Sequence, residues 1–203
     1  MVMGVMESIR WRRSIRRYRP DPVDQEAVRL VLEAATLAPS GQNAQPWDFV
    51  VVTDPGTRFK LAEFLFGAHR KYFGEARVDA VAGADLDARL NRYTGLAQAP
   101  VFIVVCLHRK RRVMKQDYDA DAYLWDVLSV GAAMENLIIA ASSLGLGTIW
   151  LGTPNLQEGS LKELLGLPED VKIAGVTPLG YPDESPKSRP RDPLEQVVHR
   201  DRW

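Results

Sequence analysis

The chain has 203 residues, of which 46% are hydrophobic, and it carries 26 Lys and Arg against 26 Asp and Glu. This length and composition fit one sizeable folded domain, which we expect to span residues 1–203. Because the formal net charge is zero, a global basic field that would hold nucleic acid is excluded, and any anion site must be local. No N-terminal apolar run follows a basic start, so we expect neither export nor a membrane anchor, and a cytoplasmic location.

The first half of the chain alternates helical and extended patterns. Asp24 precedes an amphipathic pattern that predicts a capped helix ending near Pro39. β-branched and aromatic residues predict a strand over 47–54. Residues 67–98 mix charged and apolar positions and predict one or two surface helices. Residues 100–107 are apolar on both faces, which predicts a strand in the centre of a sheet.

The second half contains the longest helical pattern, over 123–144. It is apolar nearly all round, which fits either the central helix of a layered core or half of a subunit interface. We then expect a short strand over 148–152, a short helix over 160–167 and a last strand over 172–181. The chain after Pro182 is polar and rich in proline but ends in apolar residues, so it is either an irregular strap across another surface or a frayed terminus.

The residues that could carry metal or thiol chemistry are few. The single cysteine, Cys106, lies inside the apolar run 100–107, which favours a small core residue over a nucleophile. His69, His108 and His199 have no ligand spacing with one another or with the cysteine, so we expect no metal site.

Six arginines crowd residues 10–19, the sequence RWRRSIRRYR. In a helix, Arg12, Arg16 and Arg19 would share one face, and Arg10, Arg13 and Arg17 another, so only two or three could meet one ligand. Arginine forks pair with phosphate, and Ser14 adds a hydroxyl donor among them. A solvated basic helix face is the alternative. Arg189 and Arg191, at alternate positions of an extended segment, would point the same way.

Three further stretches bear on the kind of site. The loop 38–47, APSGQNAQPW, exposes backbone and side-chain amides that can pair with a heteroaromatic ring, although an ordinary helix-ending loop explains it too. GLGTIWLG, residues 145–152, follows a helix and leads into a strand, the reverse of a dinucleotide fingerprint. The basic run 108–115 is followed by acidic residues, which favours a solvated, self-compensated loop.

Taken together and in order, five blocks resemble the nitroreductase family of flavin mononucleotide (FMN) dependent oxidoreductases. The blocks are RRSIRRY (12–18), APSGQNAQPWDFVVV (38–52), GAAMENLIIAASSLGLGTIWLG (131–152), PLGYP (178–182) and RPRDPLEQVVHRDRW (189–203). The resemblance implies an α+β fold with a mixed sheet flanked by helices. It also implies an intertwined homodimer with FMN at the subunit interface and the tail 182–203 wrapped around the partner.

The resemblance also implies cofactor-binding residues. Arg12 and Ser14 would hold the FMN phosphate, with Arg13 beside them, and Arg16 would face the pyrimidine edge of the flavin. Arg189 and Arg191 would complete the phosphate site. The loop residues Pro39, Ser40, Gly41 and Asn43 would line the neighbouring subunit's flavin, while backbone around Leu151, Gly152 and Thr153 would approach the reactive ring nitrogen. A lysine or asparagine that contacts the pyrimidine in some relatives has no secure counterpart, and Lys71 is a candidate.

The implied activity passes hydride from NADH or NADPH through FMN to nitroaromatic, quinone or similar electron-poor acceptors by a ping-pong scheme. Specialised members resemble the chain equally and remove halogen, reduce dehydro-intermediates or serve flavin or deazaflavin metabolism; residues 67–125 should decide among these. No acid–base constellation stands out, so we name no catalytic residue. A polyanion-binding module is a remote alternative, because net neutrality and the lack of an aromatic platform between the arginines oppose it. We expect no nucleic-acid or membrane partner.

Overall fold

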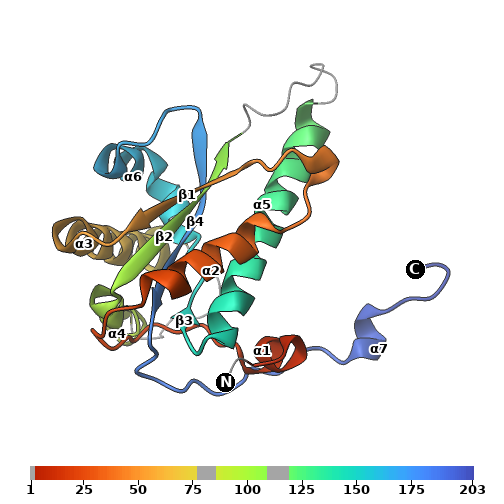
Figure 1. Ribbon diagram of the computed structural model, residues 1–203, viewed down its shortest axis with the longest axis horizontal. Helices are drawn as coiled ribbons and strands as arrows, with labels where there is room; N and C mark the ends of the chain where they lie inside the picture. The colour runs from red at the N-terminus through yellow and green to blue at the C-terminus, as the bar shows by residue number, and fades with distance from the viewer. Residues whose placement is uncertain (1–2, 77–85, 109–118) are drawn as a thin grey trace.

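The chain adopts an α+β fold in a computed structural model that describes residues 3–76, 86–108 and 119–203. A four-stranded sheet is covered by helices on both faces (Figure 1). The strands are β1 (Trp47–Val52), β2 (Val101–His108), β3 (Gly147–Thr148) and β4 (Val171–Gly180). Their order is β1-β2-β4-β3 and every pair is antiparallel. The expectation of a mixed sheet is therefore wrong for these strands, since the parallel pairing recorded among the described residues is an isolated bridge between Ser14 and Thr148.

The helices divide between the two faces of the sheet. The α-helices are α1 (Val5–Trp11), α2 (Gln25–Thr36), α3 (Pro55–Lys71), α4 (Leu86–Asn91), α5 (Asp119–Ser143), α6 (Glu158–Leu165) and α7 (Leu194–Val197). Short helical turns are η1 (Gly41–Asn43), η2 (Tyr72–Ala76), η3 (Thr94–Gln98) and η6 (Thr153–Gln157). Helices α2 and α5 cover one face, whereas α3 and α6 lie on the other (Figure 1).

The β2 strand joins two cores, as its apolar sequence predicts. It pairs with β1 on one side and with β4 on the other, which confirms its central place. Phe102, Val104 and Cys106 belong to the core under α3 and α6. The alternate residues, such as Ile103 and Val105, belong to the core under α2 and α5. Because neighbouring side chains on a strand point to opposite faces, a strand buried on both faces must be apolar throughout.

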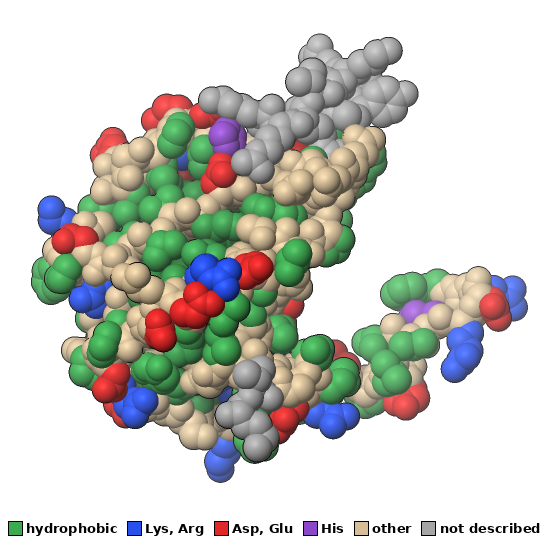
Figure 2. Space-filling model, viewed as in Figure 1, with side chains coloured by type: hydrophobic (Ala, Val, Ile, Leu, Met, Phe, Trp, Pro, Cys, Tyr) green, Lys and Arg blue, Asp and Glu red, His purple; other side chains and the backbone are tan. Residues whose placement is uncertain are grey.

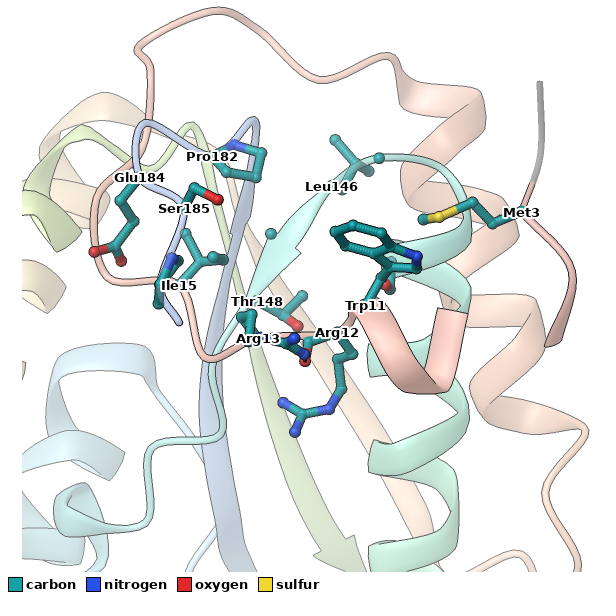
Figure 3. A pocket seen from close by; sticks show the side chains of 14 residues that line it. Met3, Trp11, Arg12, Arg13, Ile15, Leu146, Thr148, Pro182, Glu184 and Ser185 are labelled. Atoms are coloured by element: carbon teal, nitrogen blue, oxygen red, sulfur yellow. The ribbon is translucent and has the colours of Figure 1, made fainter. Parts of the chain in front are cut away.

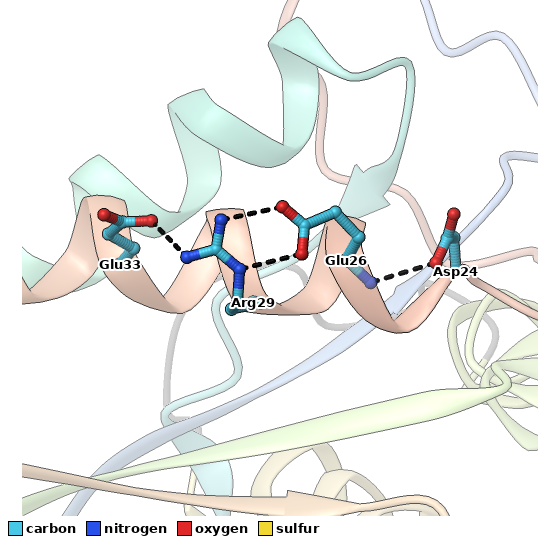
Figure 4. Close-up of polar contacts among 4 residues, drawn as sticks. All are labelled: Asp24, Glu26, Arg29 and Glu33. Carbon is cyan, nitrogen blue, oxygen red and sulfur yellow. Dashed lines mark hydrogen bonds and ion pairs between the residues drawn. The ribbon is translucent and has the colours of Figure 1, made fainter.

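The α2 helix begins as its sequence predicts, with Asp24 as the N-cap (Figure 4). The Asp24 carboxylate accepts a hydrogen bond of 2.9 Å from the amide of Glu26. On the exposed side, Arg29 donates to Glu26 and to Glu33, with distances of 2.7 to 2.8 Å. The hydrogen bond from Arg29 holds the pKa of Glu26 below its ordinary value. The Asp24 cap fixes the start of the helix. The Arg29 pairs are exposed to solvent, so they add little to the stability of the fold.

The α3 helix was not foreseen at its true start. Asp54 caps it by accepting a hydrogen bond of 2.8 Å from the Thr57 amide, and Pro55 occupies the first helical position. The helix therefore starts where the sequence predicted the end of a strand, and β1 stops at Val52. Within residues 67–98 the structure describes the end of α3, the π-helical turn η2, helix α4 and η3, while residues 77–85 lie outside the described part.

The long α5 helix is the core helix that one reading of its apolar sequence predicts, at least over its C-terminal half. Met134, Leu137 and Ala141 are fully buried in the core that α5 forms with α2 and the sheet. Nearer its N-terminus, Leu124 and Leu128 are 54% and 62% exposed. By length and composition alone the helix could cross a membrane. The buried stripe instead identifies its C-terminal half as a core helix, and leaves the N-terminal half with apolar side chains on the surface.

Two short segments depart from prediction. Within 148–152, only Thr148 belongs to a strand, and Leu151 forms an isolated bridge with Val176 of β4. After Pro182, where an irregular chain was expected, one helical turn forms as α7. The end of the tail stands clear of the globular body and carries exposed Leu194, Val197 and Trp203 (Figures 1 and 2).

The buried thiol provides a test of the core. Cys106 is 1% exposed and burial raises its pKa to about 12. Since only the thiolate reacts with alkylating reagents, we expect no labelling of the folded protein by iodoacetamide at pH 8, and full labelling in denaturant. Mass spectrometry of both samples measures this. Rapid labelling of the folded chain would contradict the burial of Cys106.

Candidate functional site

Helix α1 ends at Trp11, so Arg10 is helical and the rest of the arginine-rich segment, residues 12–19, lies outside a helix. The Ile15 amide donates to the Thr148 carbonyl at 2.9 Å, next to the bridge between Ser14 and Thr148. Ile15 and Tyr18 are buried in the core under α3 and α6, and the Tyr18 hydroxyl donates to the Ile15 carbonyl at 2.7 Å. The helical faces proposed for the arginines are therefore wrong, because strand-like pairing and burial outweigh local propensity.

The start of the tail runs antiparallel beside this segment. The Arg19 amide donates to the Tyr181 carbonyl and the Asp183 amide donates to the Arg17 carbonyl, both at 2.9 Å. Glu184 then accepts hydrogen bonds from two successive amides, those of Arg16 and Arg17. This pairing fixes the register of the tail, so the residues that follow Glu184 must pass beside Arg12, Arg13 and Ser14.

The two segments enclose a pocket of about 190 Å³, which we call the arginine pocket. Its lining residues come from three parts of the chain: Arg12, Arg13, Ser14 and Arg16; Arg92; and Pro186, Lys187, Ser188, Arg189 and Arg191. Six arginines and one lysine thus line it, and none of the described lining residues is acidic. Like charges gathered without counter-charges repel one another, so the pocket is suited to an anionic ligand with several acceptor oxygens.

Arg16 has an unused hydrogen-bonding atom. Its Nη1 donates to the Ser14 carbonyl at 3.1 Å, and its guanidinium carbon lies 5.3 Å from the centre of the Tyr93 ring. Its Nε is buried and has no hydrogen-bond partner in the part of the chain that the structure describes. Because a buried donor is costly to leave unpaired, this atom fits a ligand acceptor. The backbone of Arg16 packs closely against Gly95. A Cβ at position 95 would lie only 2.7 Å from the Arg16 carbonyl oxygen, so glycine is needed there.

A second pocket of about 210 Å³ adjoins the first and shares Arg12 and Arg13 with it (Figure 3). Its other walls are largely apolar and include Trp11, Leu146 and Pro182. In Figure 3 the Arg12 guanidinium extends away from the Trp11 indole. The two arginines therefore stand between a strongly basic pocket and a mainly apolar one.

The other predicted site residues lie elsewhere in the chain. Pro39, Ser40, Gly41 and Asn43 belong to the loop between α2 and β1, and none of them lines the arginine pocket. Their loop is held by the hydrogen bond from the Gln45 amide to Ser40 Oγ at 3.0 Å. It is also strained, because Gln42, Asn43 and Gln45 all have positive φ. Such strain gathers where a backbone is shaped for function.

Leu151, Gly152 and Thr153 also lie outside the arginine pocket. Leu151 exchanges backbone hydrogen bonds of 2.9 and 3.0 Å with Val176. Gly152 is exposed, and a Cβ added to it would meet nothing within 4 Å. The backbone at Gly152 therefore leaves room for close approach of a ligand. Within the single chain, however, Gly152 does not belong to the arginine pocket.

Lys71, the candidate for contact with the flavin pyrimidine, is the exposed last residue of α3 and lies outside the arginine pocket. Arg92 lines that pocket and was not among the residues that the sequence indicated. Arg92 follows α4 in a segment without a recognised motif, so no sequence signal pointed to it. Of the remaining arginines, Arg19 pairs with Asp21 at 3.3 Å, and the basic run 108–115 lies, apart from His108, outside the described residues.

The arginine pocket has the charge that suits an anionic ligand, and comparison with known proteins shows the class of protein to which this fold belongs. Residues 9–181 match the Nitroreductase family, and the chain belongs to that family. The family is one of NAD(P)H oxidoreductases, so the chain is an enzyme.

Individual relatives agree. A relative from Archaeoglobus fulgidus, whose name joins NADH dehydrogenase and NAD(P)H nitroreductase, is 35% identical over 203 residues, 98% of each chain. The NADPH-flavin oxidoreductase of Vibrio harveyi is 28% identical over 204 residues, which cover 98% of this chain and 75% of that protein. A Desulfovibrio desulfuricans protein solved in complex with FMN is 30% identical, with a TM-score of 0.74 over 100% of this chain and 99% of its own.

The attachment of the tail can be tested at Glu184. In Glu184→Ala the amides of Arg16 and Arg17 lose their acceptor, so we expect the tail to detach more often and trypsin to cleave after Lys187 faster than in the wild type. In Glu184→Gln the side chain keeps an acceptor oxygen, and cleavage should stay near the wild-type rate. Equal rates in Glu184→Ala and the wild type would show that these hydrogen bonds do not hold the tail.

Proposed function

We propose that the arginine pocket binds the phosphate of FMN and that the protein passes hydride from NADH or NADPH through FMN to nitroaromatic, quinone or similar electron-poor acceptors. The observation that carries this proposal is a pocket lined by six arginines and one lysine with no acidic side chain among the described lining residues. A phosphate supplies the missing negative charge and accepts bidentate hydrogen bonds from arginine. The solved complex of the Desulfovibrio desulfuricans relative with FMN supports the choice of ligand.

The residues of this chain would divide the work of binding. Arg12, Ser14, Arg189 and Arg191 would hold the phosphate, with Arg13 and Arg92 adding positive charge. Arg16 would present a fixed cation and its unpaired Nε to the pyrimidine edge of the ring. Because negative charge gathers on that edge when flavin is reduced, a fixed cation there favours the reduced state without a protein acid or base. Backbone at Leu151, Gly152 and Thr153 would approach the reactive nitrogen of the ring.

FMN, when bound, would supply the hydride-transfer chemistry, and the reduction by nicotinamide and the reduction of the acceptor would be two alternating half-reactions. The protein's part is to orient the ring and to leave one face open. Residues 67–125, from which the acceptor pocket was expected to take its shape, include two segments outside the described residues, so the choice among acceptors rests on the activity test below.

We further propose that the enzyme is a homodimer in which each loop 39–43 lines the neighbouring flavin. Three features support this. The loop lies outside its own chain's arginine pocket, the N-terminal half of α5 exposes Leu124 and Leu128, and the tail 182–203 carries exposed apolar residues at its end. Apolar side chains presented by several elements at once are typical of surfaces that a partner covers.

The binding proposal predicts a yellow protein whose affinity for FMN depends on Arg12. We expect Arg12→Ala to weaken FMN binding by about 1.5 to 3 kcal/mol, or roughly 10- to 150-fold in the dissociation constant, because a charge-assisted phosphate contact is lost. Arg10→Ala removes an exposed arginine outside the pocket and should bind FMN as the wild type does. Quenching of flavin fluorescence measures both constants. A colourless protein that takes up no FMN would refute the proposal.

The activity proposal predicts two separable half-reactions. In a stopped-flow experiment, NADH or NADPH should bleach the bound flavin in the absence of acceptor, and a nitroaromatic or quinone added afterwards should restore its colour. Steady-state rates should then give parallel double-reciprocal lines when both substrates are varied. The reduced flavin should also be tested with a panel of nitroaromatics, quinones and free FMN. If none of them reoxidises it faster than oxygen does, one of the specialised family activities is favoured.

A further inference from the structure

His69 is a buried titratable residue to which the proposed function assigns no part. It lies in α3, is 2% exposed, and does not line the arginine pocket. Yet its ring contacts Thr153, which precedes helix α6, and Tyr93, which precedes η3. One side chain of α3 therefore touches two segments on which the flavin site depends.

The hydrogen bonds of His69 define its protonation. Its Nδ1 lies 2.7 Å from the Leu65 carbonyl oxygen, and since that oxygen can only accept, Nδ1 carries the proton. The neutral ring then keeps a lone pair on Nε2, and Thr153 Oγ1 lies against the ring, 3.3 Å from Nε2 and 3.4 Å from Nδ1. Burial lowers the pKa of His69; the hydrogen bond to Leu65 opposes this and the charge of Arg16 adds to it. Because the Nδ1 proton is donated to the Leu65 carbonyl, Nε2 is the nitrogen that can accept from the Thr153 hydroxyl.

The contact with Thr153 completes the support of the exposed Gly152. On one side Leu151 is tied to β4 by its two backbone hydrogen bonds with Val176. On the other side the Thr153 hydroxyl is tied to His69. Gly152 between them is exposed, so its backbone is presented to solvent from a segment held at both ends.

The same imidazole supports Arg16 through an aromatic ring. The centres of the His69 and Tyr93 rings are 3.9 Å apart, with 34° between their planes. The guanidinium of Arg16 lies over Tyr93, 5.3 Å from its centre. A displacement of His69 would therefore move Tyr93 and with it Arg16. It would also move Thr153 and with it Gly152.

We propose that His69 is a positioning residue of the flavin site, which fixes Gly152 through Thr153 and Arg16 through Tyr93. This inference rests on the proposed function, because it concerns the two groups that would face the reactive nitrogen and the pyrimidine edge of one ring. It adds a residue that touches neither the ring nor the substrate. A neutral His69 also keeps a second positive charge away from Arg16.

The test is a double-mutant cycle that reads the flavin rather than turnover. His69→Phe keeps a ring against Tyr93 but cannot bind Thr153, and Thr153→Val removes the hydroxyl. Each should raise the FMN dissociation constant about fivefold, the equivalent of one lost hydrogen bond, and the double variant should show little further loss. The midpoint potential of bound FMN should change in the same non-additive way. Thr153→Ser and His69→Gln, which keep a hydroxyl and an acceptor, should stay close to the wild type.

The pH dependence of unfolding without flavin provides an independent reading. Because the folded protein lowers the pKa of His69, the unfolded chain takes up the proton first as pH falls below about 6.5, and the free energy of unfolding should decrease there. Arg16 and Tyr93 are the titratable groups that the described structure places against the ring. His69→Phe should lose this part of the pH dependence.

The outcomes separate the inference from the proposed function. If the wild type binds FMN but the effects of His69→Phe and Thr153→Val simply add, or leave the midpoint potential unchanged, His69 only fills the core and the inference fails while the proposed function stands. If the wild type takes up no FMN, the proposed function fails and the inference falls with it.

Discussion

The site depends on one set of backbone hydrogen bonds, those that hold residues 14–19 between β3 and the start of the tail. Each such bond contributes only about 1 kcal/mol, but together with the burial of Ile15 and Tyr18 they make the segment extended. An extended segment leaves Arg12, Ser14 and Arg16 at its surface. The antiparallel tail, held by Glu184, then carries Arg189 and Arg191 to the same place.

Gathering so many cations has an energetic consequence for the whole fold. The positive charges of arginines in one pocket repel one another, and a bound anion would neutralise this repulsion. A ligand that binds only the folded state stabilises it by mass action, so a phosphate-bearing cofactor would hold the N-terminal segment and the tail together as well as being held by them. Cofactor binding and attachment of the tail would then be one equilibrium, because most of the lining residues of the pocket come from the N-terminal segment and the tail.

The chain alone carries only part of the proposed site. In the proposed site the strained loop 39–43 and the exposed Gly152 would both present backbone to the flavin, yet neither lines the arginine pocket. The apolar side chains left on α5 and on the tail indicate where further surface would be covered. A second copy of the chain would answer both observations, since it would bring a loop to the ring and bury the apolar residues. The His69 contacts, in contrast, lie within one chain and can order Gly152 and Arg16 before a partner binds.

The sequence determined the features that depend on local chemistry. The cap at Asp24, the central position of β2 and the burial of Cys106 follow from side-chain type and spacing over a few residues. The sequence also contains the cap Asp54 and the proline Pro55 that start α3. Both directly follow a β-branched run, so the pattern predicts the end of a strand there. The nitroreductase family, too, was recognisable from short blocks whose order the chain preserves.

Only the tertiary structure decided how the arginines are used. Residues 12–19 have a sequence that suits a helix or a strand, and pairing with β3 and the tail, segments far away in the chain, selected the extended form. The entry of Arg92 into the pocket and the contact of His69 with Thr153 likewise join positions separated by more than seventy residues. No local pattern encodes such contacts, because they arise from how two cores on opposite faces of one sheet bring distant segments together.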